Sequence, residues 1–187
     1  MPTFQKELLV SLLSQKYGLD CKIGLEDDIS KNKKYFKKWL LNNNAGFITV
    51  QNSTIEYIGF EDVVRLGPFY NVYCLIENNN IFENNDGYSL LNSFPYYEII
   101  DGKLKNLGWS KSILANMLTN DVEIYEFFSK NIDKESVRKI CVKAANFGIV
   151  IETQIWEPSE FSEIYPLISK IGFHINQLLS EKFRNDL

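Results

Sequence analysis

Side chains that could do chemistry are few in this sequence. His174 is the only histidine, and the three cysteines, Cys21, Cys74 and Cys141, stand far apart. Histidines, cysteines and paired carboxylates carry most acid–base, nucleophilic and metal chemistry near neutral pH. The chain also contains neither a glycine-rich phosphate loop nor a metal-ligand spacing. We therefore predict no catalytic residue, no metal site and no cofactor.

His174 could still serve as a general base in a small-molecule enzyme, or line the pocket of a ligand-binding protein. That alternative requires a pocket that gathers His174 with an acidic residue and with Tyr96 or Tyr97. No serine, cysteine or carboxylate stands at a spacing that indicates a partner for the imidazole. Ile171 and Leu178 lie one helical turn to either side. This spacing favours a histidine packed on the apolar stripe of a helix.

Three carboxylates, Asp121, Glu123 and Glu126, fall close together. Glu123 and Glu126 are neighbours on a helix and could share a hard cation. Acids are also favoured in a first helical turn, and Asn120 followed by Glu123 has the spacing of a capping box. We favour helix capping over metal binding here.

Five lysines stand within eight residues, with no acid among them. On a helix they occupy one arc, and the aromatic residues Tyr35, Phe36 and Trp39 occupy the opposite arc. A basic amphipathic helix over 31–41 could contact nucleic acid or an anionic membrane surface. It could equally be the solvated face of an ordinary helix, with lysines favoured in its later turns. The lysines of this candidate contact are Lys31, Lys33, Lys34, Lys37 and Lys38.

Aromatic residues are concentrated between Phe69 and Tyr97, next to an asparagine-rich stretch. Alternation along strands would send some of these rings into the core and others outward. Outward rings beside a loop are typical of a partner-binding surface. The candidate partner-contact residues are Phe69, Tyr70, Tyr73, Tyr88, Tyr96 and Tyr97.

Composition indicates an ordinary globular protein. The apolar and charged fractions are 45% and 24%, and the net charge of −4 is shared evenly by the two halves of the chain. Such balance argues against a body devoted to nucleic acid or membranes. The odd, scattered cysteines are typical of reduced, buried thiols. With no signal peptide and no membrane-spanning run recognised, we expect a cytoplasmic protein.

Periodicity predicts an α+β fold, with antiparallel β-hairpins packed against several helices and a long C-terminal amphipathic helix. We expect one domain over 1–187, or two lobes, 1–77 and 96–187, joined by an Asn-rich loop at 78–95. The dipeptide Asp101-Gly102 predicts a type I′ turn between two strands. The predicted helices are 3–17, 28–41, 110–118, 121–130 and a final one ending near 183. The predicted strands are 19–23, 46–51, 55–60, 69–77, 96–100, 103–107, 137–144 and 148–156.

These observations favour a non-enzymatic protein that acts by binding a macromolecule, most simply another protein, through the region from Phe69 to Tyr97. Nucleic-acid or anionic-membrane binding through 31–41 is the first alternative. A pocket near His174 is the second. The apolar stripe of the final helix also fits a homodimer, because it could pack within the fold or against a second copy.

Overall fold

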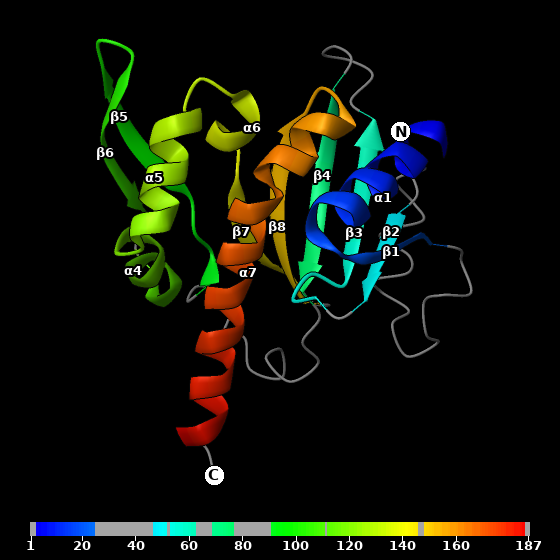
Figure 1. Cartoon of the computed structure of the whole chain (residues 1–187). Coiled ribbons are helices and arrows are strands. Elements are labelled where there is room, and N and C mark those ends of the chain that lie inside the picture. The colour runs from blue at the N-terminus through cyan, green and yellow to red at the C-terminus, as the bar shows by residue number, and fades with distance from the viewer. Residues whose placement is uncertain are drawn as a thin grey trace.

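The computed structural model describes residues 3–24, 47–51, 53–62, 69–76, 91–110, 112–145 and 148–185. It confirms the predicted α+β class, with antiparallel sheets and a long C-terminal helix (Figure 1). The helices are α1 (Thr3–Tyr17), α4 (Ile113–Thr119), α5 (Val122–Asn131), α6 (Glu135–Arg138) and α7 (Pro158–Asn185). The strands are β1 (Asp20–Ile23), β2 (Phe47–Gln51), β3 (Tyr57–Asp62), β4 (Tyr70–Ile76), β5 (Pro95–Ile100), β6 (Lys103–Trp109), β7 (Cys141–Ala145) and β8 (Gly148–Ile155).

Six strands form one antiparallel sheet in the order β1-β2-β3-β4-β8-β7. At its centre β4 pairs with β8, from Tyr70 opposite Ile155 to Ile76 opposite Ile149. Strands from before and after the stretch 78–95 are therefore direct neighbours. A pairing so distant in sequence forms because both strands carry apolar residues at alternate positions, which must be buried together.

Alternation gives this sheet an apolar face and a polar face. On β4 the side chains of Val72 and Cys74 are fully buried, whereas those of Asn71 and Tyr73, which alternate with them, are partly exposed. Helices α1 and α7 lie across the sheet in Figure 1, and α7 contacts both α1 and β8. The apolar stripe predicted for the final helix is buried, as expected: Phe161, Ile164, Ile168, Ile171, Ile175, Leu178 and Leu179.

Helix α7 continues through Pro166. Proline has no N–H to donate to the carbonyl four residues earlier, which here belongs to Ser162. The hydroxyl of Tyr17 donates to that carbonyl instead, at 2.5 Å. A side chain from α1 thus satisfies the acceptor that Pro166 leaves without a helical partner.

The second sheet contains only β5 and β6 among the described strands. Its turn has positive φ at Asp101 (52°) and Gly102 (71°), which confirms the predicted type I′ hairpin. Helices α4 and α5 contact β6, and the ring of Trp109 meets that of Phe128 edge to face at 6.0 Å. The hairpin is thereby attached to the rest of the fold through β6.

Two local predictions were wrong. Val137 was predicted to start a strand, but it lies in α6, and β7 begins only at Cys141. The backbone N–H groups of Arg138 and Lys139 donate to carbonyls of Lys134 and Glu135, and this helical turn overrides the strand preference of valine.

The predicted capping box at Asn120 is also wrong, since Asn120 ends α4. Asp121 is the N-cap of α5, and its Oδ1 accepts the N–H of Ile124 at 3.0 Å. The predicted helix 28–41 lies outside the described residues.

Candidate functional site

The structure places the predicted contact residues in several separate positions. Phe69 and Trp156 pack edge to face at 5.7 Å, and the Tyr70 hydroxyl donates to Gln5 at 2.8 Å. Tyr73 lies on the polar face of the six-stranded sheet, and Tyr96 and Tyr97 lie on β5. The remaining predicted contacts lie outside the described residues: Tyr88, Lys31, Lys33, Lys34, Lys37 and Lys38.

The carboxylate of Asp121 contacts His174, although the two residues are far apart in sequence. Its Oδ2 lies 2.7 Å from His174 Nε2 and 3.4 Å from the Nζ of Lys170, which also pairs with Glu123 at 2.7 Å. Burial tends to raise the pKa of Asp121. The hydrogen bonds it accepts from His174 and the Ile124 amide, together with the Lys170 charge, outweigh burial and lower it.

This arrangement of His174 and Asp121 provides the acid that the enzyme alternative requires, but no nucleophile. In a catalytic triad the second imidazole nitrogen faces the group to be activated. Here Nδ1 of His174 is buried and has no hydrogen-bond partner among the described residues. The contact joins the start of α5 to α7.

A groove runs beside this cluster, between the end of α1, the turn before β3 and α7. It encloses about 650 Å³ and includes Tyr165, Lys170 and Phe173 in its lining, but not His174. No group of three or more histidine, cysteine or acidic side chains in the described ranges is arranged to hold a metal ion.

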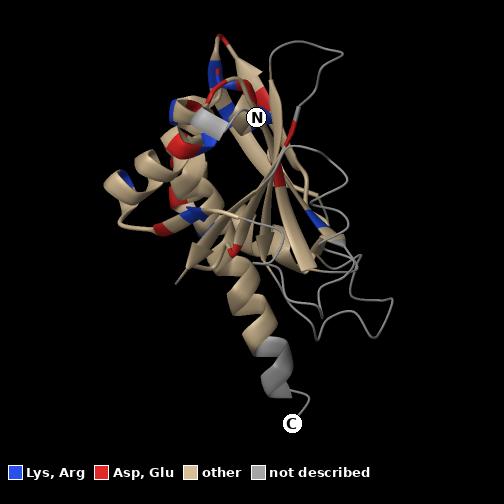
Figure 2. Ribbon diagram, turned by 90° about the vertical axis from the view of Figure 1, so that its right-hand side faces the viewer, with Lys and Arg blue, Asp and Glu red and all other residues tan. Residues whose placement is uncertain are grey.

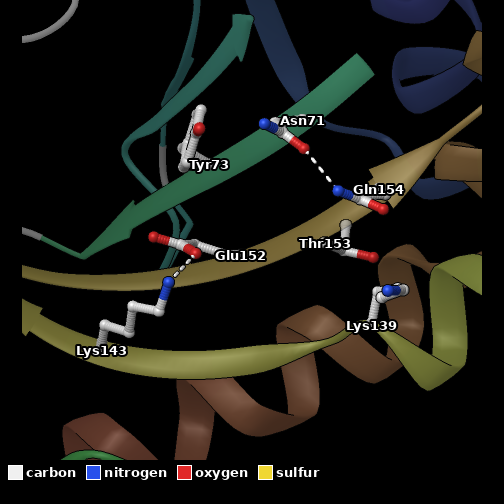
Figure 3. Close-up of a pocket in the computed structure, with 7 residues that line it drawn as sticks. All are labelled: Asn71, Tyr73, Lys139, Lys143, Glu152, Thr153 and Gln154. Carbon is white, nitrogen blue, oxygen red and sulfur yellow. Dashed lines mark hydrogen bonds and ion pairs between the residues drawn. The ribbon is translucent and has the colours of Figure 1, made fainter. Parts of the chain in front are cut away.

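A second, polar cavity of about 340 Å³ lies on the polar face of the sheet, over β4, β7 and β8 (Figure 3). Sequence analysis missed most of this site, because only the cross-strand register brings its residues together. The one available signal was alternation, which puts Asn71 and Tyr73 on one face of β4, and Glu152 and Gln154 on one face of β8. Its lining residues are Asn71, Tyr73, Lys139, Lys143, Glu152, Thr153 and Gln154.

The polar groups around this cavity bond to one another. The Gln154 amide donates to Asn71 at 2.9 Å, the Asn71 amide donates to Glu61 at 3.2 Å, and the Tyr73 hydroxyl donates to Glu61 at 2.5 Å. Burial and then Glu61 raise the pKa of Tyr73 well above its ordinary value. The phenol therefore stays protonated at neutral pH and acts as a hydrogen-bond donor.

The nearest thiol to this cavity is not activated. Cys141 lies opposite Glu152, which also forms an ion pair with Lys143. Burial, and next the charge of Glu152, raise the pKa of Cys141 to about 11. A thiol rather than a thiolate is present at neutral pH, and thiols are weak nucleophiles. The cavity therefore offers polar groups for contact, and the thiol beside it is protonated.

The edges of the two sheets differ in how they are protected. At one edge of the large sheet, β7 is covered: Ser93 and Val142 exchange backbone hydrogen bonds of 3.0 and 2.8 Å, and the Asn92 side chain accepts from the Ala144 N–H. At the other edge, β1 has only four residues, and it exposes Asp20. Short, charged or covered edges resist pairing with other chains.

Strand β5 is longer than β1, and among the described residues nothing covers its outer side beyond Ser93, although Pro95 begins it and its register with β6 shifts between Glu98 and Ile99. It pairs only with β6 in the part of the chain that the structure describes. Its outer face presents Phe94, Tyr96 and Ile100, whose exposed fractions are 46%, 59% and 44%. The single charge on this strand is Glu98. An exposed, mainly apolar edge strand is a ready template for pairing with another polypeptide.

Hydrogen bonding along the hairpin shows which backbone groups face outward. The Ser110 N–H donates to the Phe94 carbonyl at 2.8 Å, so this pair lies at a hydrogen-bonded position of the ladder. Because such positions alternate in antiparallel sheets, the backbone groups of Tyr96 and Glu98 also face β6. Those of Pro95, Tyr97 and Ile99 are directed to the opposite side, on which Ser93 already exchanges hydrogen bonds with Val142 of β7; the register with β6 shifts between Glu98 and Ile99.

Acidic and basic residues are interspersed along the described ribbon (Figure 2). None of the helices within the described ranges combines the length and apolarity that crossing a bilayer requires. All three cysteines are free, as the sequence predicted; Cys21 and Cys74 are buried and Cys141 is partly exposed.

The described residues thus form an α+β protein with a covered large sheet and a hairpin whose β5 strand pairs with β6 alone. No protein-family model, no curated protein and no solved structure matches the chain.

Proposed function

We propose that the protein is non-enzymatic and acts by binding proteins, with an extended segment of the partner adding to the free edge of β5. The observation that supports the proposal is that β5, which is mainly apolar, pairs with β6 alone among the described strands. In strand addition, main-chain hydrogen bonds supply affinity and alternate side chains supply selectivity. Tyr97 and Ile99 offer the backbone donors, and Tyr96 and Ile100 offer the apolar contacts.

Other features support binding over catalysis. Cys141 carries a raised pKa, and the His174 imidazole is held by Asp121 without a group to activate. The three free cysteines fit the cytoplasm, where thiols stay reduced, and we assign the protein to that compartment as part of the same proposal.

The proposal is tested by affinity capture with the full-length chain, comparing two double variants. Tyr96→Lys with Ile100→Lys places charges on the β5 edge region. Ile113→Lys with Val122→Lys makes the same change at exposed apolar positions on α4 and α5. Wild type and the second variant should retain a specific protein other than the bait, and the first should bind it about tenfold more weakly, a loss of about 1.4 kcal/mol.

Nuclease treatment and two salt concentrations complete the experiment. A strand-addition interface should survive both, because its contacts are apolar and main-chain hydrogen bonds. Unchanged capture by Tyr96→Lys/Ile100→Lys, with circular dichroism showing both variants folded, would contradict the proposal. Capture that vanishes with nuclease or modest salt would instead favour nucleic-acid binding by the lysines of 31–41.

A further inference from the structure

Strand β8 extends beyond the start of its neighbour β7, beside the polar cavity. Strand β7 begins at Cys141, opposite Glu152, whereas β4 stays paired with β8 along the rest of its length. Val142 exchanges its backbone hydrogen bonds with Ser93, on the side away from β8. Hydrogen-bonding directions alternate along an antiparallel strand, so Cys141 and Glu152 bond to each other. By the same alternation, Gln154 directs its backbone N–H and C=O away from β4, to the side on which β7 has not yet begun.

These backbone groups of Gln154 bond to no described residue. Continuing the register would set Lys139 opposite Gln154, but Lys139 caps α6 and donates its N–H to carbonyls within that helix. The next position that faces the same side is satisfied, because the Trp156 N–H donates to the Glu160 carboxylate at 2.8 Å. Gln154 is partly buried and lines the cavity. A backbone donor and acceptor at such a position favour a ligand that supplies one acceptor and one donor.

Charge in the cavity indicates the sign of that ligand. Lys143 and Glu152 form an ion pair and neutralise each other. The ammonium group of Lys139 forms no hydrogen bond or ion pair with the residues that the structure describes, and it leaves one unbalanced positive charge in the lining. Figure 3 shows Lys139 on the side of Gln154, and Lys143 toward the other end of the cavity. An anionic group placed beside Gln154 would therefore be attracted.

The start of β7 limits the shape of what can bind there. A segment that runs antiparallel to β8, as β7 does, heads toward Ile140 and Cys141, which already fill the following positions. It must therefore end at the residue opposite Gln154. A segment that runs the other way would begin at this position, and its terminal ammonium would face the ammonium of Lys139, which is unfavourable.

We propose that this position binds an α-carboxylate whose amino group is acylated, as at the carboxyl end of a polypeptide or in an N-acyl amino acid. The amide N–H of the ligand donates to the Gln154 carbonyl. One carboxylate oxygen accepts the Gln154 N–H, and the other accepts from Lys139, in hydrogen bonds strengthened by charge. The site is separate from β5, so the inference does not rest on the proposed function.

Nuclear magnetic resonance of the ¹⁵N-labelled full-length chain tests the site directly. The probes are the N-acetylated amino acids, each titrated as the free acid and as the carboxamide. At least one free acid should shift the backbone N–H resonance of Gln154. Its carboxamide should bind about tenfold more weakly, because it loses the charge that faces Lys139.

Two neighbouring cations provide a matched pair of variants. Lys139→Gln should weaken binding of the free acid by about tenfold. Arg138→Gln, one residue away and also exposed, should leave it unchanged, because Arg138 lines a different cavity. Tyr96→Lys/Ile100→Lys should also bind the probe as wild type does, so failure of this site and failure of the proposed function are distinguishable.

Acetylated hexapeptides that end in the best-bound residue identify the source of the ligand. Tighter binding of the hexapeptide than of the single residue would assign the site to polypeptide ends, and equal binding would assign it to N-acyl amino acids. Equal binding of free acid and carboxamide would overturn the carboxylate site, as would equal losses for Lys139→Gln and Arg138→Gln. Absence of any shift at Gln154 with every free acid at millimolar concentration would overturn the site itself.

Discussion

The six-stranded sheet and the β5–β6 hairpin are built from similar residues but differ in what covers them. The large sheet buries one face under α1 and α7, and its β7 edge is closed by Asn92 and Ser93. The hairpin is covered over β6 by α4 and α5, while β5 remains open among the described residues. Two residues, Asn92 and Ser93, are enough to cover the β7 edge. Among the described residues β5 has no such cover along its length, which makes it a candidate for binding another polypeptide.

The contrast between the covered sheet and the open strand is tested most directly by replacing one isoleucine with alanine in each region. Ile151 on β8 is fully buried, and Ile100 on β5 is 44% exposed. We expect Ile151→Ala to lower the free energy of unfolding by about 2–5 kcal/mol, because it leaves a cavity in the core. Ile100→Ala should change it by no more than about 0.5 kcal/mol in the monomer.

Urea denaturation at low protein concentration measures both values. Equal losses for Ile151→Ala and Ile100→Ala would mean that the β5 edge is buried in the protein under those conditions, and would contradict the division into a covered sheet and an open edge.

A smaller effect is expected at Asp121, which connects the hairpin's helical cover to α7. Asp121→Ala removes the N-cap of α5 and the contacts with His174 and Lys170, and should cost about 1–2 kcal/mol. Asp121→Asn keeps a capping oxygen, so it should cost less and report mainly the loss of charge. Glu123→Gln, at a largely exposed carboxylate, is the control.

The pH dependence of these variants has a defined sign. The folded-state pKa of Asp121 is lower than its ordinary value of 3.8, so its contribution to stability is present above that value. It is lost as the pH falls through the folded-state pKa. Wild type should therefore lose stability relative to Asp121→Asn on acidification below about pH 4. Parallel curves for the two proteins, from urea denaturation between neutral and acidic pH, would argue against the ion-paired carboxylate.

The smallest effect is expected within the covered region, at the link between α1 and α7. Tyr17→Phe removes the hydroxyl that donates to the Ser162 carbonyl and should cost about 1 kcal/mol. In a Pro166→Ala background the backbone N–H restored at that position can donate to the same carbonyl, so Tyr17→Phe should cost less. A double-mutant cycle of thermal unfolding measures the difference, and equal costs in both backgrounds would show that Tyr17 does not replace the missing helical hydrogen bond.

Local features were predictable where nearby residues decide them. The Asp101-Gly102 turn was recognised because few residues other than glycine, asparagine and aspartate tolerate positive φ at such positions. The buried stripe of α7 was recognised because its apolar residues repeat at helical spacing. Val137 was assigned wrongly because its strand preference is weaker than the turn that closes around it.

Sites made by distant residues were not predictable. His174 had no partner at any readable spacing, and Asp121 reaches it only because α5 packs against α7. The cavity of Asn71, Tyr73 and Glu152 depends on the register of β4 against β8. A shift of one residue in either strand would place these side chains on opposite faces of the sheet.

By itself, the sequence determined the α+β class, the hairpin turn, the long amphipathic helix and the free thiols, because these follow from local conformational preference, periodicity and composition. Only the tertiary structure decided which strands became neighbours, and therefore which edge was left open. Edge protection depends on pieces of chain that meet across the fold, as Ser93 meets Val142, and the corresponding cover is absent at β5 among the described residues. No spacing within β5 carries that information, because an edge is a property of the assembled sheet.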